Sequence, residues 1–273
     1  MEGSQRFFRR LVLAGFCLLG LSAGVTAQPD HSPWGVLLGE HVRVLEGGVA
    51  TEVDYRGFAR QRPQLQAYLT SLSKITPADY DAWSPDIRLA FLINAYNAWT
   101  VDLILQRYPD LDSIRDLGTL FRSPWKRAFI PLLGQTVSLD DIEHGMIRAP
   151  GVFDEPRIHF AVNCASIGCP ALRPEPFLAA TLDAQLEQAT RLFLSDRSRN
   201  RHENDRLYVS EVFRWYREDF EKGWRGTDSL GQFLAGYREA LGLDAESARR
   251  LASGAIPIRY LDYDWRLNDV TNP

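Results

Sequence analysis

One long apolar stretch limits how this chain can fold. Residues 84–109 read SPDIRLAFLINAYNAWTVDLILQRYP, and Ser84 followed by Pro85 is typical of a helix N-terminus. Apolar residues lie on nearly every face of that helix, so it should be buried at the centre of the domain. No Gly-Ser or Pro-rich linker divides the chain, and 45% of its residues are hydrophobic, enough for one large core. We predict a single, helix-rich α/β (mixed) domain in which a small sheet is packed by several helices.

Three of the polar residues in this helix are candidates for a pocket. Asn94 and Asn97 stand three residues apart and therefore share a face, and Arg88 lies near the helix start. Buried amides need partners, because an unpaired polar group costs a few kcal/mol in an apolar environment. We expect these side chains either to make structural hydrogen bonds, Arg88 with a carboxylate such as Asp141 or Glu143, or to line a pocket.

The N-terminus has the pattern of a secretory signal peptide. Three arginines precede the apolar run LVLAGFCLLGL, and Val25 and Ala27 are the small residues of a cleavage site. The run is short for a membrane span, and Phe16 is too large for lipoprotein processing at Cys17. We predict that residues 1–27 are removed and that residues 28–273 form one exported domain, periplasmic or extracellular, without a transmembrane segment.

The charge of the chain excludes some classes of partner. The formal net charge is −4, and loss of the arginines of the signal peptide makes it more negative. Such a surface does not favour nucleic acid or anionic lipid. No motif calls for a cofactor, and we expect none. The partner is predicted to be a small-molecule, peptide or protein ligand.

Residues 157–173, RIHFAVNCASIGCPALR, carry the densest candidate chemistry. The apolar first half predicts a strand over residues 157–163, which ends at a loop of small residues. The N–H groups of that loop are candidates for an oxyanion site beside Cys164. In an oxidising compartment, Cys164 and Cys169 are equally candidates for a disulfide. Four interpretations of Cys164 are therefore open: it is a nucleophile, half of a disulfide, a metal ligand or a buried small side chain.

A thiol nucleophile needs a base and a group that orients the base. In the predicted strand, His159 and Cys164 lie on opposite faces, so His144 is the better candidate. His144 belongs to a short helix predicted from SLDDIEHGMIR, and Glu143 beside it is a candidate orienting group. These histidines and Cys169 could add metal ligands, but the H-x4-C-x4-C spacing matches no familiar zinc pattern, so no metal site is predicted.

Two aromatic stretches near the C-terminus are interpreted mainly as packing. FRWYREDF, at residues 213–220, has the pattern of an amphipathic helix, and Tyr263, Asp264, Trp265 and Asn268 form an aromatic and polar terminus. Asp264 is a secondary candidate for orienting a histidine.

Four motifs in a fixed order make the chain similar to a known family. They are RLAFLINAYNAW, VSLDDIEHGMIR, RIHFAVNCASIGCPALR and YLDYDWRLN. Over roughly residues 34–268 the chain resembles the domain-of-unknown-function family 547, a resemblance that implies no established activity. Some members of that family have serine at the position of Cys169, whereas the first cysteine is usual. The resemblance therefore implies that a disulfide is not the shared purpose of the family.

These observations leave three functional hypotheses. The first is an exported, cysteine-dependent hydrolase or acyl transferase that acts on an amide or ester. The second is a non-catalytic binding module, and the third is a structural or redox-responsive domain with a disulfide. An accessible Cys164 within reach of a histidine favours the first, a cleft without that pair the second, and bonded sulfurs the third.

Overall fold

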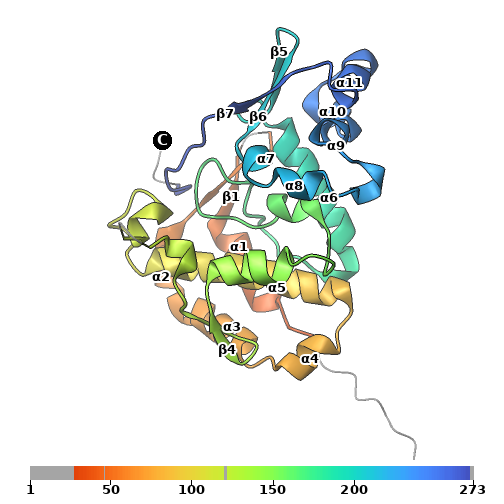
Figure 1. Cartoon of the computed structure of the whole chain (residues 1–273). Helices are drawn as coiled ribbons and strands as arrows, with labels where there is room; N and C mark the ends of the chain where they lie inside the picture. Colours follow the sequence, from red (N-terminus) through yellow and green to blue (C-terminus); the bar gives the residue numbers. More distant parts are fainter. Residues whose placement is uncertain (1–27, 46, 120–121, 271–273) are drawn as a thin grey trace, which may run out of the picture.

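The computed structural model describes residues 28–45, 47–119 and 122–270 (Figure 1), so the predicted signal peptide lies outside the described residues. Within them, short strands form three small sheets and helices make up most of the regular structure. The predicted class, a mixed and helix-rich α/β single domain, is confirmed. No helix in this part of the chain is long and apolar enough to cross a membrane.

The elements have the following bounds. The α-helices are α1 (Ser32–His41), α2 (Tyr55–Arg60), α3 (Arg62–Ser73), α4 (Pro77–Asp81), α5 (Pro85–Leu105), α6 (Leu182–Ser195), α7 (Val212–Trp215), α8 (Arg217–Phe220), α9 (Leu230–Gly236), α10 (Arg238–Leu241) and α11 (Ala245–Ala252). The tighter or wider helical turns are η1 (Ile114–Leu117), η2 (Pro124–Lys126), η3 (Asp141–Ile147), η4 (Pro156–Phe160), η5 (Ala179–Thr181) and η6 (Trp224–Gly226). The strands are β1 (Val42–Val44), β2 (Thr51–Val53), β3 (Ile130–Leu132), β4 (Gln135–Val137), β5 (Arg201–Glu203), β6 (Arg206–Ser210) and β7 (Ile258–Leu261).

Helix α5 is the buried centre that its sequence predicts. The Ser84 hydroxyl accepts a hydrogen bond from the N–H of Ile87 at 3.4 Å and caps the helix. Every residue from Leu89 to Leu105 is buried. The helix packs against α2, α3, η3 and η5, so elements that precede it and elements that follow it in the chain surround it. Figure 1 shows α5 crossing the molecule, with α3 and α4 below it and α9–α11 on its other side, at the top of the view.

The third sheet brings the C-terminal segment back to the centre of the chain. β6 pairs antiparallel with β5 and parallel with β7, and helices α7–α11 make the crossover between β6 and β7. After β7 the chain runs beside the cysteine loop, residues 164–169. There the N–H of Ile167 donates to Arg266 O and the N–H of Gly168 donates to Asp264 O, both at 2.9 Å.

The apolar core has two parts that meet at the cysteine motif. One cluster surrounds α5, and the other is built from α6, β6 and the C-terminal helices. Ile158, Ala161 and Val162 belong to the first cluster, whereas Phe160 belongs to the second. This short segment therefore joins the two halves of the core.

The strand predicted over residues 157–163 is wrong. Residues Pro156–Phe160 form the 3-10 helix η4, and the Glu155 side chain accepts a hydrogen bond from the N–H of Arg157 at 3.0 Å. Ile158, Ala161 and Val162 share one cluster at the i, i+3, i+4 spacing of a helical turn, whereas a strand would place residues 158, 160 and 162 on one face. The short helix predicted over residues 138–148 is confirmed as η3, a π-helix preceded by the Ser138–Asp141 capping hydrogen bonds.

Asn94 and Asn97 make structural hydrogen bonds from α5. Asn97 Nδ2 donates to Ala161 O at 2.9 Å, and its Oδ1 accepts from the N–H of Asn163 at 2.8 Å. In the same way Asn94 Nδ2 donates to Phe177 O at 2.7 Å, and its Oδ1 accepts from the N–H of Phe177 at 3.0 Å. Each amide thus holds a loop against the central helix.

We expect Asn94→Leu and Asn97→Leu each to lower the free energy of unfolding. Each substitution leaves a buried N–H and a buried C=O unpaired, at a cost of about 1–3 kcal/mol per group. Denaturant unfolding followed by circular dichroism measures the change. Gln64→Leu, at an exposed position of α3, is the matched control and should change stability by no more than about 0.5 kcal/mol. Unfolding curves for both asparagine variants that overlay the wild type would contradict the structural interpretation.

Candidate functional site

A pocket of about 440 Å³ opens where the two parts of the core meet. It is lined from α5, η3, the cysteine loop, α7 and the C-terminal segment by Tyr96, Ser123, Trp125, Asp140, Glu143, His144, His159, Val162, Cys164, Cys169, Pro170, Val212, Trp215, Tyr216, Tyr263 and Trp265. All four predicted catalytic residues and Cys169 therefore line one cavity. Its volume lies in the range of small-ligand sites, about 300–1,000 Å³.

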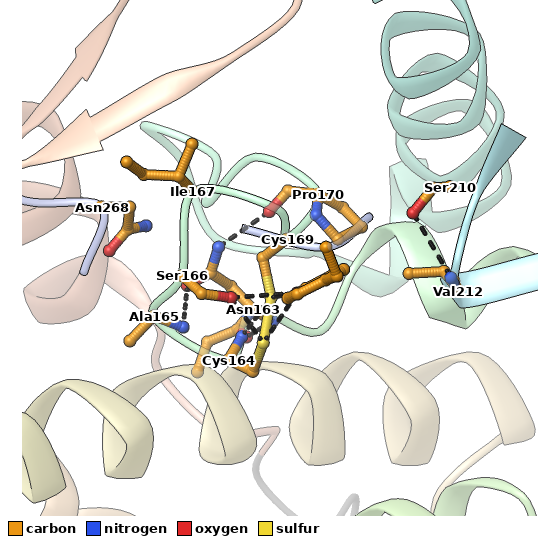
Figure 2. The surroundings of a disulfide bond; sticks show 12 residues. Asn163, Cys164, Ala165, Ser166, Ile167, Cys169, Pro170, Ser210, Val212 and Asn268 are labelled. Atoms are coloured by element: carbon orange, nitrogen blue, oxygen red, sulfur yellow. Dashed lines mark hydrogen bonds between the residues drawn. A yellow bond between two sulfur atoms is a disulfide. The ribbon is translucent and has the colours of Figure 1, made fainter. Parts of the chain in front are cut away.

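The cysteine loop is fixed at both ends by one amide. Asn163 Nδ2 donates to Pro170 O at 2.7 Å, and Asn163 Oδ1 accepts from the N–H of Ala165 at 2.9 Å (Figure 2). Ala165 has a φ of 62°, in the left-handed region that alanine seldom adopts. The hydrogen bond to Asn163 therefore holds the backbone in a conformation that costs about 1 kcal/mol or more.

Most amides of this loop already have acceptors and are not free for the predicted oxyanion site. The N–H groups of Ala165, Ile167 and Gly168 donate to Asn163 and to the C-terminal segment. The N–H of Cys164 donates to Cys169 Sγ at 2.9 Å, and the N–H of Cys169 to Ser166 O at 3.0 Å. Five of the six amides of residues 164–169 are therefore occupied in the disulfide form.

Cys164 and Cys169 are joined as a disulfide in the structure, with their Cα atoms 6.2 Å apart. The Tyr263 hydroxyl lies 3.2 Å from Cys164 Sγ and donates to Cys169 Sγ at 3.1 Å. Ser166 Oγ is 3.2 Å from Cys164 Sγ and 2.9 Å from the Tyr263 hydroxyl. Burial raises the pKa of Tyr263, so its phenol stays protonated at neutral pH and remains a hydrogen-bond donor.

Gly168 allows this tyrosine to approach. A Cβ at position 168 would lie 2.9 Å from two ring atoms of Tyr263, closer than carbon atoms can pack. The glycine is therefore required for the contact between the C-terminal segment and the two sulfurs.

His159 forms a pair with a carboxylate that sequence reasoning did not single out. Its Nε2 hydrogen-bonds Asp219 Oδ2 at 2.8 Å, and Asp219 also accepts from Arg148 Nε at 2.5 Å and Lys222 Nζ at 2.8 Å. Burial alone would raise the pKa of Asp219, but the hydrogen bonds from His159, Arg148 and Lys222 outweigh it and hold that pKa well below its usual range. Burial lowers the pKa of His159 although Asp219 opposes the shift, so the ring is neutral at pH 7.

The free nitrogen of His159 follows from this pairing. A neutral ring that donates from Nε2 to a carboxylate has its lone pair on Nδ1, a tautomer assigned from the hydrogen bond. Among the described residues, His159 Nδ1 is buried and has no hydrogen-bond partner. The ring stacks on Tyr216 with centroids 4.0 Å apart. His159 therefore has the form of a general base whose proton-accepting atom is unused.

His144, the base favoured by the sequence, is placed differently. Its Nδ1 contacts Arg148 Nη1 at 2.5 Å, its Nε2 lies 3.7 Å from Asp140 Oδ1, and its side chain is 40% exposed. The guanidinium is always a donor, so it occupies the lone pair of Nδ1. The preference for His144 rested on a strand that does not form, and His159 has the better geometry for a base.

Glu143 does not orient a histidine but lies buried among tyrosines. Only 5% of it is exposed, and its carboxylate interacts with the hydroxyls of Tyr96 and Tyr216. Burial first, and then the Glu143 charge, raise the pKa of both tyrosines. The basic side chains that follow it, His144 and Arg148, face Asp140 and Asp219 instead. In the part of the chain that the structure describes, Glu143 has no ion-pair partner.

Arg88, Asn94 and Asn97 lie outside the pocket lining. The Arg88 guanidinium lies over the ring of Tyr80, 5.8 Å from its centroid, and the carboxylate of Asp141 accepts hydrogen bonds from Ser138. The predicted pairing of Arg88 with Asp141 or Glu143 is therefore not formed. Within the described ranges, no group of three or more His, Cys, Asp or Glu side chains is arranged to hold a metal ion.

The aromatic wall of the pocket was also missed. Trp215 stacks on Trp265 with centroids 5.6 Å apart, and Tyr263 lies 4.8 Å from the first and 4.5 Å from the second. Trp125 meets Trp265 edge-on at 5.9 Å. These residues come mainly from the two aromatic stretches that sequence reasoning interpreted as packing. The clustering of tryptophans with acids in those stretches was the available signal.

The His159–Asp219 pair should make stability fall on acidification. A buried neutral histidine contributes stability above its unfolded pKa of about 6.5, and this is lost as pH falls below that value. Asp219, whose folded pKa is lowered, contributes stability above about pH 4 that is lost below it. Urea unfolding from pH 7 to pH 3 measures both ranges. His159→Gln should reduce the slope between about pH 6.5 and 5, and Asp219→Asn the slope below about pH 4, each by up to about 1.4 kcal/mol per pH unit. Slopes that neither variant changes would contradict the pairing.

The model of the family described as "Protein of unknown function, DUF547" matches residues 80–194. This segment contains α5, η3 and the cysteine loop, whereas Asp219, Tyr263 and Trp265 lie beyond it. No curated protein and no solved structure matches the chain. Residues 80–194, which supply both cysteines, both histidines and Glu143 of the pocket, are thus the part of the chain that is similar to the DUF547 family of proteins of unknown function.

Proposed function

We propose that this is an exported enzyme in which Cys164, when reduced, is the nucleophile of an acyl hydrolase or acyl transferase acting on a small amide or ester. One observation carries the proposal: Cys164 and an Asp219-oriented histidine with an unused nitrogen line the same pocket. A nucleophile, a base and a group that orients the base are the minimum set for thiol catalysis.

The proposed reaction assigns one task to each group. His159 Nδ1 accepts the thiol proton, and the resulting imidazolium is stabilised by Asp219 through Nε2. Attack of Cys164 on the acyl carbon forms an S–C bond, and the leaving amine or alcohol takes the proton back from His159. Water then hydrolyses the thioester, or an acceptor nucleophile takes the acyl group.

Two side-chain hydroxyls beside Cys164 are candidate donors to the oxyanion of this reaction. The Tyr263 hydroxyl, 3.2 Å from Cys164 Sγ, and the Ser166 hydroxyl, also at 3.2 Å, lie beside the atom that would attack. A protonated phenol is a suitable donor to developing negative charge. The raised pKa of Tyr263, caused by burial, keeps that proton in place.

A second function is favoured by a different observation. The sulfurs are bonded and the loop hydrogen bonds are complete, which suits a binding or structural domain whose disulfide shapes the pocket. Disulfide formation masks the nucleophile, so the two functions exclude each other within one molecule. Under the first proposal, an external thiol must reduce the disulfide before catalysis.

We expect reduced Cys164 to react with iodoacetamide at pH 7 about tenfold faster than an ordinary thiol, whose pKa is about 8.5. The rate is measured by mass spectrometry on Cys169→Ser, in which Cys164 is the only cysteine of residues 28–273. His159→Gln in this background should remove the excess rate at pH 7, because the base is lost. At pH 10, where any thiol ionises, the two proteins should react at similar rates.

His144→Gln is the matched control, since His144 lines the same pocket but its Nδ1 faces Arg148. It should leave the rate at pH 7 within about twofold. The proposal of thiol catalysis fails if the pKa of Cys164 is about 8.5, the ordinary value for a free thiol, and its alkylation rate does not change in His159→Gln.

Export makes a separate prediction about the N-terminus. The exported protein should have the intact mass of a chain that begins at Gln28, because the signal peptide pattern ends at Ala27. Replacing Ala27 with Trp should block cleavage and leave the uncleaved mass. A wild-type protein that keeps residues 1–27, or carries lipid on Cys17, would refute export in this form.

A further inference from the structure

The pocket contains carboxylates and aromatic rings but no lysine or arginine. Six tyrosines and tryptophans line it together with Asp140 and Glu143, and its two histidines are the only basic side chains among the described lining residues. From this composition we propose that the pocket binds an organic ammonium group, quaternary or protonated. An aromatic cage closed by an acid is the arrangement that recognises such cations.

Glu143 carries the first part of the argument. A buried carboxylate is normally paired with a cation, because its desolvation costs several kcal/mol. Glu143 is 5% exposed, and its partners are the neutral hydroxyls of Tyr96 and Tyr216. His144 and Arg148 are directed to Asp140 and Asp219. A ligand cation in the pocket would supply the charge that the described side chains do not.

The aromatic wall carries the second part. Trp215, Tyr263 and Trp265 pack against one another with centroids 4.5–5.6 Å apart, so the wall is preformed. Trp215 remains 41% exposed although it is a large apolar residue. The faces of Trp and Tyr rings attract a cation by about 0.5–2 kcal/mol each, most strongly where the site is shielded from water. An exposed tryptophan on a pocket wall is thereby explained.

Two of these rings already attract cations of the protein. Arg148 lies over Tyr216, 4.8 Å from its centroid, and Arg115 lies over Trp265 at 5.3 Å. Neither arginine lines the pocket. The charge of Arg148 is offset by its ion pair with Asp219 at 2.5 Å. It therefore does not cancel the attraction of Glu143 for a ligand.

The ligand class also narrows the substrate. With an ammonium group held by Glu143 and the aromatic wall, the acyl carbon would be presented to Cys164, which lines the same cavity. The inference that the substrate is an ammonium-bearing amide or ester rests on the proposed thiol chemistry. The inference that the pocket binds an ammonium group does not depend on that chemistry.

The test compares choline with its neutral isostere 3,3-dimethyl-1-butanol, in which carbon replaces the charged nitrogen. Isothermal titration calorimetry is performed on the full exported chain in its disulfide form, where thiol chemistry cannot contribute. We expect choline to bind at least tenfold more tightly than the isostere. Equal affinity for the two probes, or no binding of choline, overturns the proposal.

Two variants test whether choline binds to Glu143 and the aromatic wall, and a third is the control. Glu143→Gln keeps a polar group of the same size beside the two tyrosines but removes the charge, and should weaken choline binding about tenfold without changing the affinity of the isostere. Trp215→Leu keeps apolar bulk but removes the ring, and should weaken choline severalfold. Glu239→Gln, at an exposed site on α10 with a side chain 75% exposed, is the matched control and should bind as the wild type.

The outcomes separate the two proposals. Should Glu143→Gln fail to fold, the Trp215→Leu result decides, and unchanged choline affinity there overturns the ammonium site. Choline binding with an unreactive Cys164 would leave the binding inference standing and remove the enzyme. A reactive Cys164 in a protein that binds choline and the isostere equally would support the enzyme and overturn the ammonium site.

Discussion

The hydrogen bonds between the Asn97 amide and the backbone at residues 161 and 163 are the contact on which the site depends. Helix α5 is buried along its length, so this amide lies where an unpaired polar group is most costly. It therefore fixes the backbone on either side of Val162. Asn163, placed by that bond, closes the cysteine loop through Ala165 and Pro170. The positions of both sulfurs thus derive from one polar group in an apolar helix.

Much of this arrangement could be predicted from local sequence. The buried helix, its Ser84 cap and the structural need of Asn97 for partners all follow from apolar periodicity and the cost of unpaired amides. The strand over residues 157–163 could not, because a short apolar run after a proline is compatible with either a strand or a helical turn. What decided between them was the position of two apolar clusters, a property of the whole fold. The wrong strand also reversed the ranking of His144 and His159 as candidate bases, since strand alternation was the argument against His159.

The other half of the site depends on partners that are remote in sequence. Asp219 meets His159 across 60 residues, and Tyr263 meets Cys164 across 99. No spacing rule connects such positions, because the parallel pairing of β6 with β7 and the helical crossover bring them together. An approach as close as that of Tyr263 to Gly168 is likewise visible only once both segments are placed. Local patterns identified Cys164 and Glu143 as candidate residues, whereas tertiary packing placed Asp219 beside His159 and the Tyr263 hydroxyl beside both sulfurs.

Tyr263 belongs to both chemical parts of the pocket. Its hydroxyl contacts both sulfurs, while its ring packs against Trp215 and Trp265 in the aromatic wall. Opening the disulfide would change the partners of the hydroxyl, and the proposed ligand on the wall would change those of the ring. Since one side chain carries both sets of contacts, ligand affinity and the thiol–disulfide equilibrium are thermodynamically linked. If the ligand binds one redox form more tightly by some factor, then ligand binding must shift the thiol–disulfide equilibrium toward that form by the same factor.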